Sequence, residues 1–252
     1  MNEILKVEGV SLTYYTKTME TPAVSDLTFS LYEGEFVAIV GPSGCGKTSV
    51  LSVVAGLLPP TKGKVTFLGK DKKLADGVGY MLQKDELFPW RTIYKNVVLP
   101  LEIKHRLTEE NERYVSDLLR KYGLAEFANY YPRQLSGGMK QRAALIRTLS
   151  YKPDLLLLDE PFSALDYQTR LSVSDDVYRI IKEEKKTALL VTHDIAEAIS
   201  MADRVIVLSR RPAKIKNIYD LKQDPALSPL KRREGERFRA WFELLWKELN
   251  EG

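Results

Sequence analysis

The chain has 252 residues and a formal net charge of +4, from 38 basic and 34 acidic residues. Hydrophobic residues make up 44% of it, which excludes an intrinsically disordered chain and supports one sizeable α/β core. The small net charge gives no reason to expect a nucleic-acid partner, and no apolar run reaches the ~20 residues of a membrane-spanning helix.

The first ten residues, MNEILKVEGV, lack the basic and then apolar pattern of a secretory signal. Cys45 is the only cysteine, so the chain cannot form an intramolecular disulfide. Both features agree with a reducing compartment. We therefore expect a cytoplasmic protein that reaches a membrane only through a partner.

A glycine-rich segment, GPSGCGKT at residues 41–48, matches the phosphate-binding pattern G-x-x-x-x-G-K-[ST]. The apolar run at residues 36–40 predicts a strand before it, and the spacing at residues 48–58 predicts a helix after it. Glycines at 41, 44 and 46 would let backbone N–H groups approach phosphate oxygens at the positive end of that helix. A plain glycine-rich turn would not need this strand and helix, so the pattern favours a P-loop NTPase.

Within this loop, Lys47 would reach the β and γ phosphates of ATP, and Thr48 would ligate Mg²⁺. We also expect that alkylation of Cys45 blocks nucleotide binding and that ATP protects the thiol. The expected nucleotide-binding residues of the loop are Gly41, Pro42, Ser43, Gly44, Cys45, Gly46, Lys47, Thr48 and Ser49.

Two carboxylates follow a second apolar run, Leu155 to Leu158, which is typical of a strand buried on both faces of a parallel sheet. Ligands bind at the carboxyl ends of such strands. Asp159 is therefore placed to hold Mg²⁺ through its water shell, and Glu160 to polarise the attacking water. The alternative, an acidic helix cap, is weaker in a chain that already carries a P-loop.

The segment LSGGMKQR at residues 135–142 places Ser-Gly-Gly at the start of a predicted helix, which creates a second anion site. It resembles the signature of ABC ATPases, with Met139 where the commonest form has Gln. The resemblance implies that Ser136, Gly137 and Gly138 of one subunit close over the γ phosphate held by another. A head-to-tail homodimer with ATP between its subunits follows. A glycine-rich loop before an amphipathic helix at residues 139–149 is the other interpretation.

The same resemblance assigns further residues. Thr187 to Thr192 reads as a strand that ends at His193, which resembles the switch histidine that senses the γ phosphate. Gln83 resembles the Q-loop residue that contacts Mg²⁺ and the water. Residues 163–166 resemble the D-loop, which crosses the dimer interface. Tyr14 is our choice for the aromatic ring that stacks on adenine, with Tyr15 as the alternative.

The resemblance covers almost the whole chain and implies one α/β domain. The expected fold is a RecA-like P-loop NTPase of the ABC type, with an antiparallel β portion near the N-terminus and an inserted helical subdomain. The nucleotide-binding core would comprise residues 1–83 and 151–225, and the helical subdomain residues 84–150, including an amphipathic helix after Thr108.

Residues 226–252 would form a C-terminal helix, because apolar residues recur there at helical spacing from Phe238 to Leu249. We expect this helix to dock on its own domain, with a regulatory or partner contact as the alternative. The basic cluster Lys231, Arg232 and Arg233 reads as a solvated face.

Two segments, LFPWRTIYKNV at 87–97 and VLSRRPAKI at 207–215, resemble the ATPases of nitrate, sulfonate and taurine importers. The resemblance implies that Phe88, Pro89 and Trp90 receive a permease's coupling helix at the cytoplasmic face of the membrane. A periplasmic or extracellular solute-binding protein would then be an indirect partner. The alternative is that Pro89 and Trp90 only shape a loop.

Other kinds of ABC ATPase share these motifs. A soluble ATPase of translation usually has two cassettes in one chain, and one of chromosome maintenance has a long coiled-coil insertion; the sequence shows neither. A catalytically silent nucleotide switch would lack one of the catalytic residues. An exporter cassette is disfavoured by the importer-like segments. The sequence predicts no particular cargo.

Overall fold

The computed structural model describes residues 2–68 and 74–250. Its strands are β1 (Glu3–Tyr15), β2 (Glu20–Tyr32), β3 (Phe36–Val40), β4 (Lys62–Phe67), β5 (Val78–Met81), β6 (Leu155–Asp159), β7 (Thr187–Val191), β8 (Arg204–Leu208) and β9 (Ile215–Asp220). Its α-helices are α1 (Lys47–Val54), α2 (Leu74–Gly77), α3 (Ile93–Ile103), α4 (Glu109–Lys121), α5 (Gly137–Leu149), α6 (Tyr167–Glu183), α7 (Ile195–Met201), α8 (Pro229–Arg232) and α9 (Glu236–Asn250). Short 3₁₀ turns at Ala125–Phe127 and Pro132–Gln134 lie between α4 and α5.

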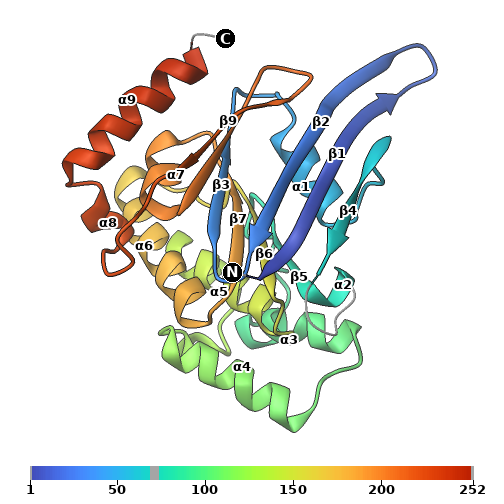
Figure 1. The fold of residues 1–252 in the computed structure, drawn as a ribbon. Helices are drawn as coiled ribbons and strands as arrows, with labels where there is room; N and C mark the ends of the chain where they lie inside the picture. The colour runs from blue at the N-terminus through green and yellow to red at the C-terminus, as the bar shows by residue number, and fades with distance from the viewer. Residues whose placement is uncertain (1, 69–73, 251–252) are drawn as a thin grey trace.

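The larger sheet has the order β5-β6-β7-β3-β8-β9, in which only β9 runs antiparallel to its neighbour. Every residue of β3, β6 and β7 is buried, as expected for parallel strands covered on both faces. The smaller sheet is antiparallel, with the order β2-β1-β4. Figure 1 shows the long β1–β2 hairpin beside the larger sheet, with α1 between the two. The predicted α/β fold with an antiparallel N-terminal portion is confirmed.

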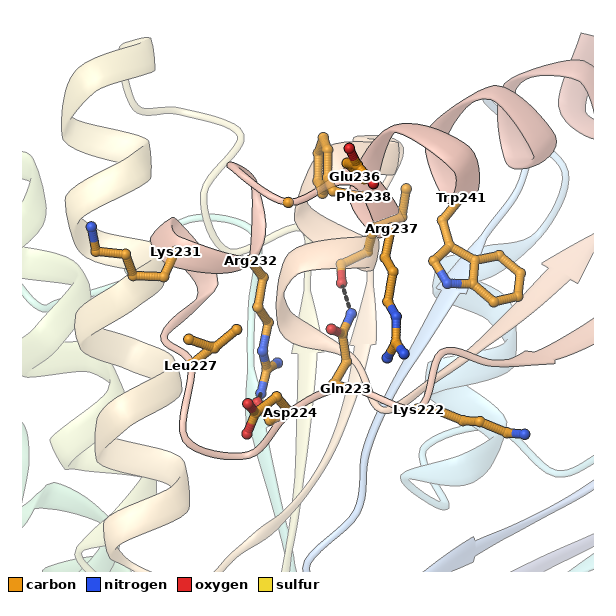
Figure 2. A pocket seen from close by; sticks show the side chains of 12 residues that line it. Lys222, Gln223, Asp224, Leu227, Lys231, Arg232, Glu236, Arg237, Phe238 and Trp241 are labelled. Carbon is orange, nitrogen blue, oxygen red and sulfur yellow. Dashed lines mark hydrogen bonds between the residues drawn. The ribbon is translucent and has the colours of Figure 1, made fainter.

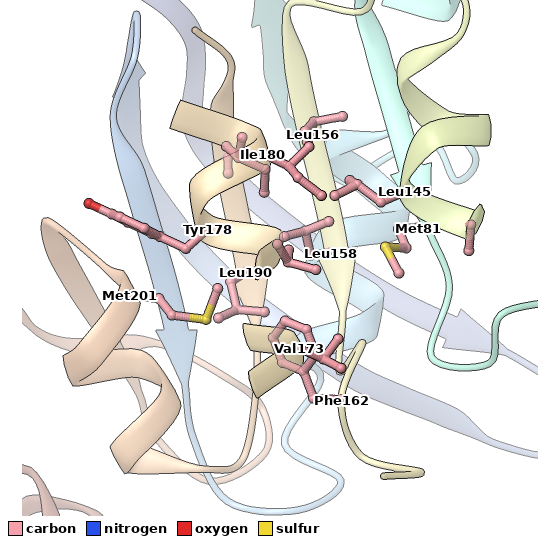
Figure 3. Packing of buried hydrophobic residues seen from close by; sticks show 14 of the residues in the cluster. Met81, Leu145, Leu156, Leu158, Phe162, Val173, Tyr178, Ile180, Leu190 and Met201 are labelled. Carbon is pink, nitrogen blue, oxygen red and sulfur yellow. The ribbon is translucent and has the colours of Figure 1, made fainter. Parts of the chain in front are cut away.

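Alternate side chains of the central strands enter two separate hydrophobic clusters. In β3, Phe36, Ala38 and Val40 join the cluster under the helices, while Val37 and Ile39 join the one that faces α1 and the smaller sheet. Figure 3 shows Leu156, Leu158 and Leu190 of the sheet packed against Val173 and Ile180 of α6. Truncating one of these leucines to alanine would cost about 2–5 kcal/mol. This packing on both faces holds the central strands rigidly, and with them the sheet edge from which the loops after β3, β6 and β7 start.

Helices α3, α4 and α5 form the inserted helical part of the chain, and α3 and α4 lie at the bottom of Figure 1. Helix α4 begins where the sequence predicts, because the Thr108 side chain accepts a hydrogen bond from the Asn111 backbone N–H. The numerical boundaries proposed for core and helical subdomain stay predictions. One helix is shorter than expected: α1 ends at Val54 rather than near Leu58, because Gly56 has a φ of 72°, which closes the helix.

The C-terminal segment docks on its own domain. Helix α9 packs against α7, with Leu245 fully buried, and α8 packs against α6 and α7. A pocket of about 370 Å³ lies beneath α9, lined in part by Arg232 and Trp241 (Figure 2). The expectation that Lys231, Arg232 and Arg233 form a solvated face is wrong for Arg232. That side chain is 5% exposed and donates to Ser200 O, Tyr178 Oη and Asp224 O.

Candidate functional site: a phosphate loop beside a carboxylate pair

The phosphate loop connects β3 to α1 at the carboxyl edge of the larger sheet. Gly44 and Gly46 have φ angles of 73° and 121°, which non-glycine residues rarely adopt. A Cβ atom at Gly46 would also lie 2.9 Å from the Ala23 carbonyl oxygen of β2. The sequence therefore needs glycine here both for the turn and for the close approach of the smaller sheet.

Lys47, the first residue of α1, is held inside its own loop. Its Nζ donates to the carbonyl oxygens of Gly41 at 2.8 Å and Pro42 at 3.0 Å, and the residue is only 6% exposed. Ser43 and Gly44, at the tip of the loop, are exposed. The ammonium group thus lies under a solvent-facing arc of backbone, an arrangement suited to an anion with several oxygens.

Asp159 faces Thr48 across the end of β6. Its Oδ1 accepts a hydrogen bond from Thr48 Oγ1 at 3.1 Å, and its Oδ2 accepts one from Tyr80 Oη at 3.1 Å. Burial raises the pKa of the Asp159 carboxyl, while the bonds from Thr48 and Tyr80 lower it. Burial also raises the pKa of Tyr80, so its hydroxyl stays a donor.

This donor set fits Mg²⁺, which prefers oxygen ligands and is usually bound through one or two protein groups together with phosphates and water. Thr48 supplies a hydroxyl and Asp159 supplies a carboxylate oxygen, and the two groups are joined by a hydrogen bond. Among the described residues, no group of three or more His, Cys, Asp or Glu side chains is arranged to hold a metal ion by itself. Thr48 and Asp159 would supply two of the oxygen ligands of such an ion.

Glu160, His193 and Gln83 meet at the same edge. Glu160 Oε2 lies 3.0 Å from His193 Nδ1 and 3.5 Å from Gln83 Nε2, and Gln83 Nε2 also lies 3.3 Å from Ser163 Oγ. Glu160 has a φ of 45°, an uncommon value for a non-glycine residue, at the turn that leaves β6. The turn is fixed by a bond from its N–H to Val191 O of β7.

Ser136, Gly137 and Gly138 lie apart from the phosphate loop, at the start of α5. Ser136 caps the helix by accepting from the Met139 N–H. A Cβ atom at Gly138 would lie 2.7 Å from Val173 Cγ2 of α6, so the close contact of the two helices requires glycine. These three residues and the D-loop residues Ala164 to Asp166 line one open pocket of about 660 Å³.

Tyr14 and Tyr15 are neighbours in β1, so they point to opposite faces of the smaller sheet. The Tyr14 hydroxyl lies 3.0 Å from Ser49 Oγ of α1, and the ring is 38% exposed. Tyr15 is 62% exposed. Tyr14 is thus the tyrosine directed at the helix that follows the phosphate loop.

Cys45 is less accessible than the sequence led us to expect. Its side chain is 2% exposed, and burial raises the pKa of its thiol. The thiol packs beneath the loop, where a Cβ atom on Gly41 would lie 2.9 Å from its Sγ. Alkylation of the folded protein is therefore not a convenient test of the site.

Sequence reasoning missed two residues of this region. Tyr80 bonds Asp159, and Arg170 of α6 bonds both Leu165 O in the D-loop and Asp194 after β7. Neither lies in a recognisable motif. The helices within residues 2–68 and 74–250 include none that is long and apolar enough to cross a membrane.

Comparisons with known proteins agree with this arrangement. The model of the family described as "ABC transporter" matches residues 24–163. The chain is 48% identical, over 98% of its length and 95% of the relative, to an uncharacterized ABC transporter ATP-binding protein, YtlC, of Bacillus subtilis. It is 35% identical, over 86% of its length and 85% of the relative, to an aliphatic sulfonates import ATP-binding protein, SsuB, of Bacillus cereus.

A solved structure leads to the same family. It is titled a dimeric, post-hydrolysis state of the ATP-binding cassette MJ0796, bound to ADP and phosphate. It has a TM-score of 0.72 and 32% identity, and it covers 88% of this chain and all of its own. A second dimeric structure of that cassette has a TM-score of 0.73. From the phosphate loop, the carboxylate edge and these matches, we conclude that the chain belongs to the ABC transporter family as an ATP-binding subunit.

Proposed function

We propose that this chain is the ATP-hydrolysing subunit of a membrane importer. The observation that carries the ATPase part is the convergence of Lys47, Thr48, Asp159, Glu160 and His193 at one sheet edge. These groups provide a phosphate cradle, two oxygen donors for Mg²⁺ and a carboxylate for the attacking water. A nucleotide switch without hydrolysis would not need Glu160.

Each residue has a distinct task in this proposal. Lys47 and the loop N–H groups hold the β and γ phosphates, and Tyr14 stacks on the adenine. Thr48 and Asp159 hold Mg²⁺ near the phosphates, with Gln83 beside them, and the ion would neutralise charge that develops on the phosphate oxygens. Glu160 orients and deprotonates the water, and His193 supports Glu160 through Nδ1 while Nε2 reaches the γ phosphate.

The second half of each ATP site would come from another copy. Ser136, Gly137 and Gly138 line an open recess whose lining includes no residue of the chain's own phosphate loop. A head-to-tail homodimer brings this recess over the γ phosphate of the partner. The dimeric state of the MJ0796 cassette, which resembles this chain, supports the arrangement. ATP would close the dimer, and hydrolysis would reopen it.

The surface after Gln83 supports a membrane partner. Phe88 is 38% and Trp90 71% exposed, and their rings lie 5.1 Å apart. The fully buried Asn96 shapes this loop, because its Oδ1 accepts from Phe88 N–H and its Nδ2 donates to Phe88 O and Arg91 O. Exposed aromatic side chains on a loop that Asn96 holds in place are typical of an interaction surface, and we propose that this surface receives a permease's coupling helix.

The names of the relatives support the proposed import direction and solute class. SsuB proteins of several Bacillus species are named for aliphatic sulfonate import. We therefore propose uptake of a small solute such as nitrate, a sulfonate or taurine, with a solute-binding protein outside the membrane. The subunit would lie peripherally at the cytoplasmic face.

Affinity purification from detergent-solubilised native membranes tests this function. We expect the tagged chain to retain a polytopic permease, identified by mass spectrometry, with a solute-binding protein. Trp90→Ala should lose the permease, whereas Trp246→Ala, which removes another exposed tryptophan on α9, should keep it. A chain that retains only ribosomes or DNA, or that binds no membrane protein, would favour a soluble ABC ATPase. A permease with no solute-binding protein would favour an exporter.

A further inference from the structure

Two loops that the proposed reaction depends on leave neighbouring strands side by side. The D-loop, defined here as Ser163 to Asp166, follows β6, and the H-loop, defined as Thr192 to Asp194, follows β7. Strands β6 and β7 pair in parallel, with Asp159 opposite Val191. Both loops therefore start at the same edge of the larger sheet, next to the contact between Glu160 and His193.

The side chain of Arg170, in the first turn of α6, bridges the two loops. Its Nη2 donates to Leu165 O in the D-loop at 3.1 Å, and its Nη1 donates to Asp194 Oδ2 in the H-loop at 3.4 Å. Its Nε lies 3.8 Å from Glu197 Oε1, within ion-pair distance. The planar guanidinium of an arginine can donate to three partners in fixed directions. A lysine ammonium, on a flexible stem, would not hold the same three partners in place.

The two acidic partners of Arg170 fix the backbone on both sides of His193. Glu197 Oε2 accepts a bond from Thr192 Oγ1 at 2.7 Å, and Thr192 Oγ1 in turn accepts from the Asp194 N–H at 3.0 Å. Asp194 Oδ1 accepts from the N–H groups of Ala196 and Glu197, which starts α7. His193 thus lies between two residues that are both anchored to the same small network.

The buried carboxylate of Glu197 depends on Arg170 for part of its charge compensation. The residue is 3% exposed, and an unpaired carboxylate at such depth is costly. Burial and the nearby Asp194 carboxylate raise the pKa of Glu197, to about 7, against the opposing effects of Thr192, Arg170 and Arg233. Removal of Arg170 would therefore weaken the charged form of Glu197 as well as release the D-loop carbonyl.

We propose that Arg170 is a positioning residue that ties the D-loop to the H-loop, so that movement of the D-loop against the partner subunit is transmitted to His193. The proposal rests on the dimeric ATPase proposed above. Arg170 contacts neither the phosphate loop nor Glu160 in the interactions described, so it acts through the backbone that carries His193. It links dimer closure to the alignment of Glu160 within one subunit.

The test uses the two histidines of the chain as spectroscopic reporters. His193 and His105 give separate imidazole signals in a proton–carbon NMR spectrum, assigned with His105→Gln. Arg170→Gln should shift the His193 signals and leave those of His105 unchanged. The matched control is Arg179→Gln on the same helix, whose exposed side chain pairs only with Asp176 among the described contacts and should shift neither signal.

Kinetics provide the second readout. Arg170→Gln should lower kcat by about tenfold while ATP affinity stays within about twofold, because the phosphate loop is untouched. In a His193→Ala background, Arg170→Gln should cause no further loss if it acts through His193. A further loss of about tenfold in that background would overturn the proposal, because it would show an effect independent of the histidine.

Arg170→Lys separates the effect of the hydrogen bonds between the two loops from the effect of the positive charge. It also replaces Arg170→Gln as the test variant if Arg170→Gln does not fold. It keeps the positive charge and loses the fork, so the His193 signals should still move. Wild-type signals in Arg170→Lys, or in a folded Arg170→Gln, would overturn the proposal. A wild-type chain without ATPase activity would overturn the proposed function alone, because the imidazole signals still decide whether Arg170 positions His193.

Discussion

Glu160 and His193 come from neighbouring parallel strands, and Oε2 of the first lies 3.0 Å from Nδ1 of the second. The contact uses one nitrogen of the imidazole and directs the other, Nε2, away from Glu160. The side chains are 21% and 51% exposed, so both border solvent at the edge of the sheet. Both side chains are therefore accessible to the nucleotide and water of the proposed reaction.

Lys47→Ala should weaken ATP binding by at least about tenfold, because a hydrogen bond to a charged group contributes about 1.5–3 kcal/mol. Titration with a fluorescent ATP analogue measures this directly. Lys64→Ala, which removes an exposed lysine of β4, is the control and should bind ATP like the wild type. Equal affinity in Lys47→Ala and the control would remove Lys47 from the phosphate site.

Tyr80→Phe should raise the Mg²⁺ concentration needed for tight ATP binding by about tenfold, in line with the effect of losing a group that orients a metal ligand. The substitution keeps the ring and deletes the hydroxyl that donates to Asp159 Oδ2 and that also bonds Ser52. Isothermal titration of the ATP-loaded, hydrolysis-deficient chain with Mg²⁺ gives the value. Tyr151→Phe, which loses a bond to Val78 O at the other end of β5, should leave Mg²⁺ affinity unchanged.

Cys45 should react slowly with a thiol reagent in the folded protein and rapidly after unfolding in urea. Its side chain is 2% exposed, and burial raises the pKa of the thiol, so less thiolate is present at pH 8 than in a free cysteine. Because the chain has a single cysteine, the release of a chromophore from the reagent reports this site alone. Rapid modification of the native chain would contradict the packing described for the loop.

Glu197→Gln should gain stability relative to the wild type as pH rises from 5 to 8. Burial raises the pKa of Glu197 to about 7 from an ordinary value of 4.5. Between these values the unfolded chain releases this proton while the folded protein keeps it, so the free energy of unfolding falls as pH rises. Melting temperatures of Glu197→Gln and wild type across this range provide the test. Glu126→Gln, at an exposed glutamate, is the control variant for these melting temperatures.

The main architecture could be predicted because its signals are local. A glycine pattern between an apolar run and a helical run identifies the phosphate loop, and Leu155 to Asp159 reads as a buried strand with a polar end. The contacts of Tyr80 and Arg170 could not be predicted in this way, because they depend on which strands pair and how close the loops after them lie. The pairing of β5 with β6 is what brings Tyr80 to Asp159.

The two errors have different origins. The helix after the phosphate loop looked longer in the sequence because Leu57 and Leu58 continue the apolar spacing, but Gly56 adopts a left-handed conformation that ends it. The run Lys231 to Arg233 looked solvated because three adjacent cations usually are. Packing of α8 against α6 and α7 instead buries Arg232, whose guanidinium finds the carbonyl and hydroxyl partners that its burial requires.

The most direct test of the central claim compares the wild type with Glu160→Gln for ATP binding, hydrolysis and ATP-dependent dimerisation by light scattering. We expect Glu160→Gln to bind ATP with wild-type affinity, to hydrolyse it at least about a hundredfold more slowly, and to accumulate as a dimer. Turnover that persists in Glu160→Gln, or a chain that stays monomeric with bound ATP, would contradict the account of a composite site with Glu160 as its base.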